Sequence, residues 1–266
     1  DKSFLPGNNA IMVPHTSDGR VLFATPWHDK VIVGTTDTPV DDIALEPRAL
    51  AEEIEFLLSH AAQYLTKDPK PSDVLSIFAG LRPLVSPSDT DDTAALSRDH
   101  TIYISRTGLV TITGGKWTTY RKMAEDTIDH AATVAHLPDR TSISRDLHIH
   151  GYHNYAEKFG DLALYGSDAP AIKDLLYQQP ELKQPLHPNM TTIAGEVIWA
   201  VRKEMARTVE DFLARRTRAL LLDARASIEM APKVARLMAD ELQKDDAWVE
   251  TQVQQYRELA RGYLLE

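Results

Sequence analysis

The spacing of apolar residues changes near residue 142, and this change constrains the fold more than any other feature of the sequence. Before it, short apolar runs bounded by turn residues are typical of β structure, with helical stretches between them. After it, almost every apolar residue recurs at helical spacing. The sequence therefore predicts an α+β portion over residues 1–142, followed by an all-α domain over residues 143–266.

The first part is expected to combine short strands with one early helix. An apolar stripe predicts that helix over residues 47–66, with Pro47 in its first turn. Residues 26–30 are expected to form a hairpin loop, and the polar, acidic residues 86–93 a longer loop. Strands are expected at residues 10–14, 21–25, 31–35, 74–80, 101–105 and 108–113.

The second part begins after a histidine-rich connection over residues 141–154 and is expected to be helical throughout. Thr208 and Asp211 have the spacing of a capping box. Met205 falls on the apolar face of the helix before them, and Pro232 is tolerable only in a first helical turn. Helices are expected at residues 155–165, 169–178, 193–205, 209–222, 228–242 and 249–263.

The stretch Gly114–Arg121 is the main candidate for a binding site. The strand at 108–113 leads into Gly114 and Gly115, and a helix is expected to begin at Trp117. Glycines let the backbone approach a ligand closely, and the free N–H groups of a helix start favour an anionic or electron-rich group. Lys116 adds a full charge and Thr118 a hydroxyl. An equally weighted alternative is a structural turn in which the glycines serve packing alone.

Two arginines near strand ends extend this candidate site. Arg82 follows the expected strand at 74–80 and precedes Pro83, which restricts the backbone of Arg82 to extended conformations. Arg98 lies just before the strand at 101–105. Arginine is suited to bidentate binding of phosphate or carboxylate, so together with Lys116 they indicate a small-anion site. Taken singly, each arginine is more simply a structural partner of an acidic residue.

Other charged residues have simpler interpretations. His148 and His150 share a spacing that suits a metal, but no third ligand follows with a zinc-like spacing, so no metal site is expected. The charged stretch over residues 201–218 is interpreted first as a salt-bridged helix pair. A site for an anion or a lipid headgroup is the second interpretation of that stretch.

Composition excludes several classes of protein. The net charge of −10 argues against broad nucleic-acid binding. The absence of cysteine excludes disulfides, thiolate metal ligands and a thiol nucleophile. No apolar stretch approaches the length of a membrane span, so any membrane contact is expected to be peripheral.

Several motifs follow one another in a fixed order along the whole chain. They are Pro26–Trp27, Gly34–Asp37, Ala79–Leu84, Ser97–His100, Gly114–Glu125 and Ala200–Arg218. In this order they resemble the FAD-dependent glycerol-3-phosphate dehydrogenases, and Ala200–Arg218 also resembles the helical C-terminal domain of the alpha-glycerophosphate oxidases.

The resemblance implies a glutathione-reductase-like FAD/substrate domain with a mixed or antiparallel sheet, of which residues 1–142 are the C-terminal part. Residues 143–266 would be a helical cap. It implies oxidation of sn-glycerol 3-phosphate to dihydroxyacetone phosphate by hydride transfer to FAD, with electrons passed to quinone or, in the oxidases, to oxygen.

The resemblance also implies roles for single residues. Gly114, Gly115, Lys116, Trp117 and Thr118 would lie along the flavin. Arg82 and Arg98 would bind the substrate with its phosphate, and Lys116 would be the catalytic residue, near the reacting oxygen.

Two family features are missing from this sequence. The Gly-x-Gly-x-x-Gly fingerprint for the FAD pyrophosphate is absent, as is a Gly-x-His strand expected just before Asp1. The chain is therefore expected to be a C-terminal fragment, inactive alone and without FAD. The resemblance further implies a cytoplasmic protein, with peripheral contact at the inner face of a membrane and a homodimer as open expectations. The main alternative from another class is a non-enzymatic small-anion or protein-interaction module.

Overall fold

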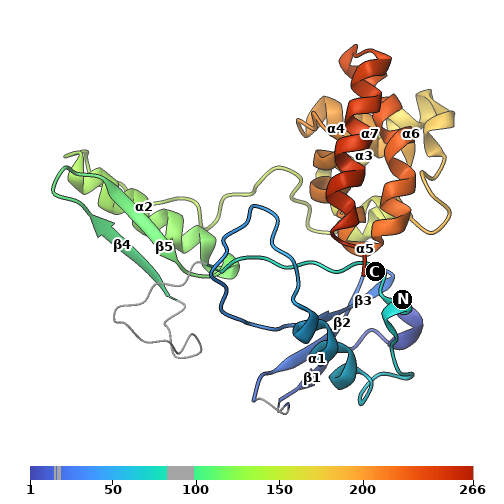
Figure 1. The fold of residues 1–266 in the computed structure, drawn as a ribbon. Helices are drawn as coiled ribbons and strands as arrows, with labels where there is room; N and C mark the ends of the chain where they lie inside the picture. Colours follow the sequence, from blue (N-terminus) through green and yellow to red (C-terminus); the bar gives the residue numbers. More distant parts are fainter. Residues whose placement is uncertain (15, 17–18, 83–98, 266) are drawn as a thin grey trace. The chain divides into compact units, whose positions relative to one another are not determined.

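The computed structural model describes residues 1–14, 16, 19–82 and 99–265, which divide into two compact units (Figure 1). The larger unit comprises Asp1–Thr38, Ala44–Gly80 and His153–Glu266. The smaller unit comprises Pro39–Ile43 and Leu81–Tyr152.

A small antiparallel sheet opens the larger unit. Its strands β1 (Ile11–Val13), β2 (Leu22–Trp27) and β3 (Lys30–Gly34) pair in the order β1-β2-β3. Trp27 pairs with Lys30, so the turn holds only His28 and Asp29 and is tighter than the predicted loop over 26–30. His28 has a φ of 54°, a positive value that two-residue hairpin turns require at their first central position.

The early helix is shorter than the prediction over residues 47–66. It is α1 (Ala51–Ala61), and the extended residue Leu50 precedes it. The Glu53 carboxylate accepts a hydrogen bond of 3.0 Å from the Leu50 N–H, and this contact fixes the helix start. The prediction that Pro47 lies in the first turn is therefore wrong.

The apolar segment Val74–Gly80 was expected to be a buried strand, but it contacts helical segments instead. No strand pairs with it among the described residues, so the prediction of a buried strand is wrong. Its backbone bonds instead to helical segments. The Ala224 N–H donates to the Leu75 carbonyl at 3.0 Å, and the Ile77 N–H donates to the Tyr263 carbonyl at 2.9 Å. Isolated bonds of this kind satisfy an extended segment without adding it to a sheet.

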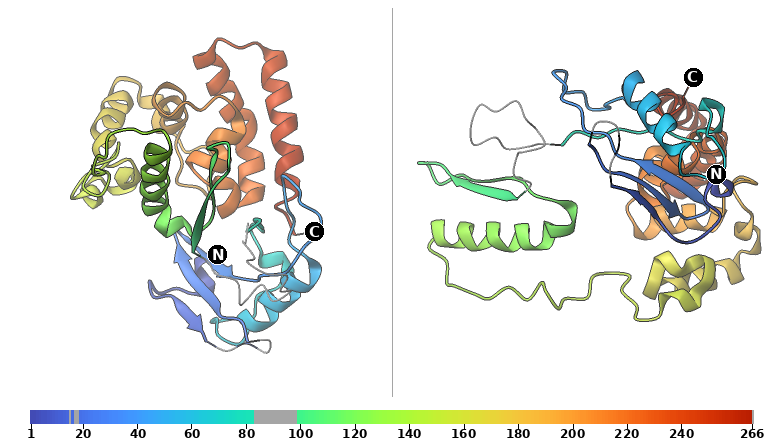
Figure 2. Two further views of the ribbon diagram at one scale, coloured as in Figure 1. Left: turned by 90° about the vertical axis from the view of Figure 1, so that its left-hand side faces the viewer. Right: turned by 90° about the horizontal axis from the view of Figure 1, so that it is seen from below.

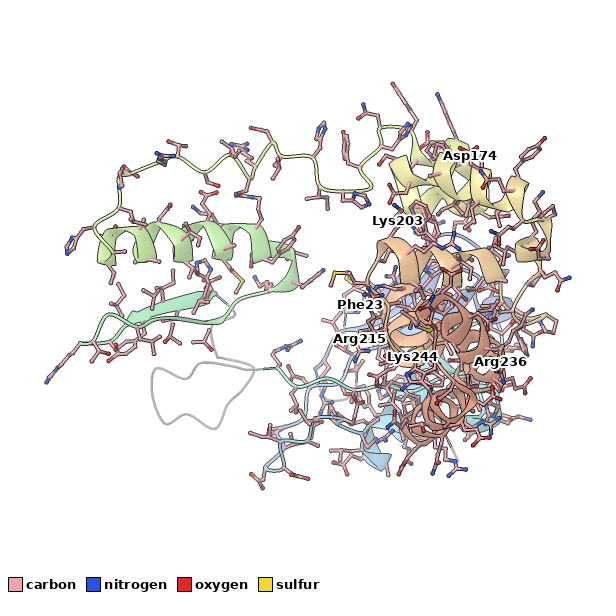
Figure 3. All side chains as sticks on the ribbon, turned by 90° about the horizontal axis from the view of Figure 1, so that it is seen from above. Phe23, Asp174, Lys203, Arg215, Arg236 and Lys244 are labelled. Carbon is pink, nitrogen blue, oxygen red and sulfur yellow. The ribbon has the colours of Figure 1, made fainter. Side chains whose placement is uncertain are left out.

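The rest of the larger unit is helical, as predicted. Short 3₁₀ turns also occur early in this unit at η1 (Lys2–Phe4) and η2 (Pro71–Asp73). The later segments are η4 (Ala156–Asp168), α3 (Ala169–Gln178), η5 (Pro180–Lys183), α4 (Ala194–Lys203), η6 (Asp211–Arg216), α5 (Ala219–Leu222), α6 (Ala224–Leu242) and α7 (Asp246–Arg261). Figure 2 shows α6 and α7 running side by side, and Figure 3 shows charged side chains such as Arg236 and Lys244 on this part.

Two of these helices end or break where the sequence suggested continuity. α4 stops at Lys203, and Met205 has a φ of 57° and is 74% exposed, so its predicted place on the apolar face is wrong. The helix predicted over 209–222 is interrupted at Arg218, whose φ is 57°. The capping box at its start is confirmed, because Thr208 and Asp211 each bond the backbone N–H of the other at 3.0–3.1 Å.

α6 starts four residues before the predicted helix at 228–242. Asp223 caps it by accepting a 2.9 Å hydrogen bond from the Ala226 N–H. Pro232 consequently lies inside the helix, and the prediction that it falls in the first turn is wrong. Pro232 is exposed, but Met230, Ala231 and Val234 beside it on α6 are fully buried, and their packing compensates for the backbone bond that proline removes.

The smaller unit is a hairpin with one helix. β4 (His100–Ile104) and β5 (Val110–Gly114) pair antiparallel, and η3 (Trp117–Thr119) leads into α2 (Tyr120–Val134), which runs along the hairpin (Figure 2). The predicted strand, turn and helix are confirmed. None of the described residues of this unit is buried, and the apolar stripe of its helix is exposed, at 86% for Trp117 and 66% for Ile128.

Candidate flavin- and substrate-binding site

The junction of β5 and η3 gives the candidate site its shape. β5 ends at Gly114 with a φ of 74°, and Gly115 follows with a φ of 82°. Both values lie in the region that only glycine adopts at no steric cost. The chain then enters the first helical turn at Trp117, where backbone N–H groups have no partner within the helix. The site therefore combines an accessible backbone with the positive end of a helix.

Gly115 also has a packing role. A Cβ atom on this residue would lie 2.4 Å from the Met123 sulfur and 3.3 Å from the His100 Cβ. The turn thus packs tightly against α2 on one side and against the start of β4 on the other. The two explanations drawn from the sequence, close packing and ligand access, are compatible, because the packing against Met123 and His100 leaves Lys116, Trp117 and Thr118 exposed.

Lys116 lies in the turn with its side chain exposed. Its backbone is held by Thr119, whose hydroxyl accepts from the Lys116 N–H at 3.2 Å and donates to the Lys116 carbonyl at 3.0 Å. Trp117 and Tyr120 stack with their ring centroids 5.3 Å apart, and both are exposed, as is Thr118. An ammonium group, a hydroxyl and an aromatic pair therefore surround the helix start.

His100 belongs beside this turn, although the sequence did not single it out. It opens β4 directly opposite Gly114, and its ring contacts the Asp126 carboxylate of α2 at 3.0 Å. Lys122 also contacts Asp126, at 2.8 Å. The hydrogen bond from Lys122, and secondarily that from His100, lowers the pKa of Asp126. The sequence could have placed His100 here only through the pairing of the two predicted strands, which brings His100 opposite Gly114.

Of the two arginines predicted from the sequence, Arg82 is among the described residues. Arg82 is exposed and belongs to the same compact unit as Lys116. Arg98, together with Pro83 and the predicted loop at 86–93, lies outside the described residues.

The charged stretch at 201–218 is a salt-bridged surface, as the first interpretation predicted. Arg202 of α4 binds Glu241 of α6 through two hydrogen bonds of 2.6 and 2.7 Å. Arg215 contacts Glu210 at 2.5 Å and Asp211 at 3.2 Å. The first pair joins α4 to α6, whereas the pairs of Arg215 lie within η6 and its N-cap, and none of them by itself forms a ligand site.

One cluster of carboxylates has the spacing of a metal site. Within the part of the chain that the structure describes, Glu125, Asp126 and Asp129 lie close enough to share an ion, but Lys122 contacts both Glu125 and Asp126. The cluster is thus partly neutralised by a lysine of the same helix. In the same part of the chain, no helix has the length and apolar character needed to cross a bilayer.

Comparison with known proteins first defines the class. Residues 2–121 match the family model of the FAD dependent oxidoreductases, and they contain the whole glycine turn. Residues 105–249, more than half of the chain, match the family model described as the C-terminal domain of alpha-glycerophosphate oxidase. The chain belongs to this family, with part of an FAD domain followed by the helical domain.

Individual relatives agree with this assignment. The chain is 37% identical to a probable mitochondrial glycerol-3-phosphate dehydrogenase of Caenorhabditis elegans and 36% identical to the mitochondrial glycerol-3-phosphate dehydrogenase of Homo sapiens. Each match covers 98% of this chain but only 38% of the relative. The chain therefore spans well under half the length of these relatives.

A solved structure gives the same result. The glycerol-3-phosphate dehydrogenase of Bacillus halodurans, complexed with FAD, matches 99% of this chain with a TM-score of 0.79 and 27% identity. The match covers 55% of that protein. The fold class and the family inferred from the sequence are both confirmed.

Proposed function

We propose that this chain is the C-terminal part of an FAD-dependent enzyme that oxidises sn-glycerol 3-phosphate to dihydroxyacetone phosphate. The observation that carries the proposal is the turn Gly114–Gly115–Lys116 at the start of a helix, within a chain whose relatives are named glycerol-3-phosphate dehydrogenases. Residues 1–142 would contribute to the cofactor and substrate site, and residues 143–266 would form the helical domain.

The residues of the turn fit the redox end of a flavin. Gly114 and Gly115 leave the backbone open, and the exposed aromatic ring of Trp117 offers a flat apolar surface. The helix start and Lys116 favour negative charge, which a reduced flavin carries. When bound, FAD would supply the acceptor for the two electrons that the substrate loses.

Substrate binding and orientation would rest on cationic side chains. Oxidation of the secondary alcohol removes a hydride from C2 and a proton from its hydroxyl. The Lys116 ammonium would donate a hydrogen bond to that oxygen and stabilise the negative charge that develops on it. Arg82 and Arg98 would hold the phosphate, because a guanidinium binds phosphate oxygens in a bidentate way.

We further propose that the electrons pass to a quinone. The relatives are named dehydrogenases, and a dehydrogenase needs an acceptor other than oxygen. Contact with a membrane that contains the quinone would be peripheral. Measuring oxygen uptake against reduction of a soluble quinone analogue tests this part of the proposal.

Variants of Lys116 and Arg82 test the reaction, in a chain that extends over the full length of the relatives. Lys116→Ala should lower kcat by about 100-fold or more, because stabilisation of a developing charge is lost. Arg82→Ala should mainly raise KM for glycerol 3-phosphate, by about tenfold or more, because one charge-assisted contact with phosphate is lost.

The matched control is Arg106→Ala, at the turn between β4 and β5. It removes one exposed cation from the same hairpin but at the opposite end of β5 from Gly114. Flavin absorbance and glycerol 3-phosphate turnover are measured for all three variants. Equal turnover by Lys116→Ala, Arg82→Ala and Arg106→Ala would refute the proposed roles.

A further inference from the structure

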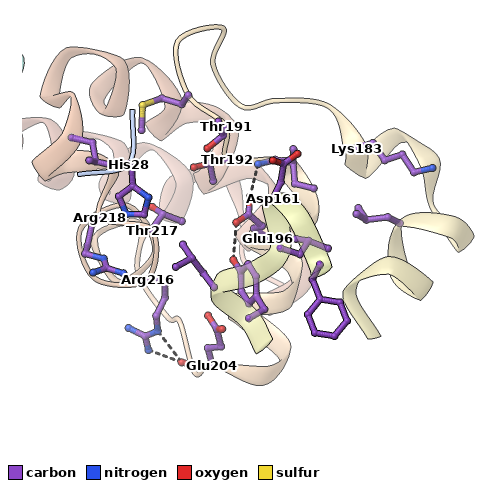
Figure 4. A pocket seen from close by; sticks show the side chains of 18 of the residues that line it. His28, Asp161, Lys183, Thr191, Thr192, Glu196, Glu204, Arg216, Thr217 and Arg218 are labelled. Atoms are coloured by element: carbon purple, nitrogen blue, oxygen red, sulfur yellow. Dashed lines mark hydrogen bonds between the residues drawn. The ribbon is translucent and has the colours of Figure 1, made fainter. Parts of the chain in front are cut away.

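A cavity inside the larger unit has no part in the proposed reaction. Its volume is about 600 Å³, and it is lined by the β2–β3 turn, by η4 and α3, and by the loop around Arg216–Arg218 (Figure 4). Cationic side chains of that loop face one part of the cavity. Apolar side chains, among them Leu164 and Met190, line another part.

Two arginines on this wall keep their charge uncompensated by a carboxylate. Arg216 donates through Nε and Nη2 to the backbone carbonyl of Glu204, and this neutral acceptor leaves the guanidinium charge in place. The guanidinium of Arg218 lies 5.9 Å from the ring centroid of Trp27. Within the described residues, neither arginine forms an ion pair, whereas the neighbouring Arg215 forms two.

Three carboxylates of the cavity are restrained or lie away from Arg218, and the Glu204 carboxylate also lines the cavity. The Glu196 carboxylate accepts hydrogen bonds from the Tyr165 hydroxyl at 2.8 Å and from the Ile193 N–H at 2.7 Å. Burial raises the pKa of Glu196, which reduces its tendency to ionise. Asp29 pairs with Lys30, and Asp161 lies well away from Arg218 in Figure 4.

The backbone at the cationic wall is held in an unusual conformation. His28 and Arg218 have φ values of 54° and 57°, a region that is costly for residues other than glycine. They come from distant parts of the sequence, yet Arg218 is close enough to lower the pKa of His28, secondarily to burial. The tight hairpin turn accounts for the value at His28, so Arg218, which precedes α5, is the strained residue of this wall.

We infer that this cavity binds a phosphate group, with Arg218 as its principal ligand and His28 and Arg216 beside it. A guanidinium without a carboxylate partner at the rim of a cavity is suited to a phosphate monoester or diester. The apolar lining would receive the organic part of the molecule. Two sources share this chemistry, a free phosphate ester and the headgroup of an anionic phospholipid.

Binding can be measured on the 266-residue chain, because the cavity and the buried core around it lie within the larger unit. Inorganic phosphate and phenyl phosphate are titrated while tryptophan fluorescence is recorded, since Arg218 lies over Trp27. Vesicles of phosphatidylglycerol, with phosphatidylcholine for comparison, test the headgroup in a sedimentation assay. Trp27→Phe shows which part of the fluorescence change comes from Trp27.

Arg218→Gln should weaken binding by about tenfold or more, because it removes the charge and keeps a side chain of similar length. Arg218→Lys should restore part of it, because the charge returns without the bidentate fork. Lys244→Ala is the matched control, as it removes an exposed cation that follows the C-terminal end of α6 and should leave binding unchanged (Figure 3 labels Lys244). Thermal melting confirms that each variant is folded, and phosphate should raise the melting temperature of the wild type but not of Arg218→Gln.

Saturable binding of phosphate or phenyl phosphate that depends on Arg218 supports a free ester as the ligand. Arg218-dependent sedimentation with phosphatidylglycerol alone supports a lipid headgroup. No binding with any probe, or equal binding by wild type and Arg218→Gln, would overturn the inference. The readout needs no flavin and no turnover, so its result is independent of the proposed reaction.

Discussion

Ser227 and Tyr256 place two hydroxyl groups inside the helical core, where they bond to each other. Ser227 is fully buried and Tyr256 is 2% exposed, so neither hydroxyl can exchange its partner for water. Tyr256→Phe should therefore lower the free energy of unfolding by about 1–3 kcal/mol, because the serine hydroxyl is left unpaired. Urea denaturation measures the change. The double variant Tyr256→Phe/Ser227→Ala should cost less than the sum of the two single variants, and strict additivity would contradict this account.

Gly115 and Gly108 permit a second test at single residues, because they differ in what surrounds them. Both have φ values above 80°, but a Cβ on Gly108 would meet only Val134, at 3.4 Å, whereas on Gly115 it would meet Met123 at 2.4 Å. Gly108→Ala should cost about 1–2 kcal/mol for backbone strain alone. Gly115→Ala should cost more and should also reduce flavin retention in a chain as long as the relatives. Similar flavin content in the two variants would separate Gly115 from the cofactor.

The positions of single residues could be predicted where the neighbouring residue types determine the local backbone structure. The glycine turn, Lys116 and the capping pair at Thr208 all follow from neighbouring residue types, and the structure has them as expected. His100 was not predictable in this way. Its position beside Gly114 depends on the hairpin register, which the sequence indicated only through the positions of two strands.

The π-helical turn η6 is an element held by one carboxylate. Burial by itself would raise the pKa of Asp211, but hydrogen bonds from the backbone N–H groups of Arg207 and Thr208 outweigh burial, and the pKa is lowered. The folded state therefore binds this proton less readily than the unfolded state, whose pKa is about 3.9. The stabilisation is present above that value and is lost as pH falls through the lower folded value.

Asp211→Asn should consequently destabilise the protein at pH 7, and the difference from wild type should shrink below about pH 4. Urea denaturation at several pH values measures it. Asp174→Asn, an exposed carboxylate on α3, is the matched control and should show no such trend. If the free energy of unfolding of Asp211→Asn stayed below that of the wild type by a constant amount down to pH 3, the stabilising role of the Asp211 carboxylate would be contradicted.

Element boundaries were less predictable than element types, for reasons that α6 and Val74–Gly80 illustrate. Apolar spacing located α6, but Asp223 as its cap placed Pro232 in the helix interior, where burial of the neighbouring Met230 and Val234 outweighs the local preference of proline. Val74–Gly80 has a strand-like composition because it contacts helices, and no local pattern separates that case from a sheet strand.

At the scale of the whole molecule, the extended segment before Gly80 is bound to the helices of the larger unit. The Ser76 hydroxyl donates to the Leu220 carbonyl at 2.8 Å, next to the backbone bonds of Leu75 and Ile77. Contacts across 144 residues of sequence cannot be deduced from periodicity. They join Ala44–Gly80 to the helical part in one compact unit, whereas the sequence pattern alone suggested a division near residue 142.

The two compact units should differ in stability, because their burial differs. α4 and α6 carry fully buried side chains such as Val197 and Met230, whereas no described residue of β4, β5 or α2 is buried. A hairpin with a single helix and no buried residue has little hydrophobic stabilisation. Amide hydrogen exchange followed by mass spectrometry should therefore show β4 and β5 exchanging about 100-fold faster or more than α6.

Amide hydrogen exchange of a chain as long as the relatives tests whether additional residues stabilise the smaller unit. The exposed apolar stripe of Trp117 in η3 and of Tyr120 and Ile128 on α2 has the composition of a buried face, and covering it would supply the core that the smaller unit lacks. Protection of α2 should then rise in the longer chain, while that of α6 stays the same. Equal protection of β4 and α6 in the 266-residue chain would contradict the predicted difference, because it would require a source of stability other than apolar burial.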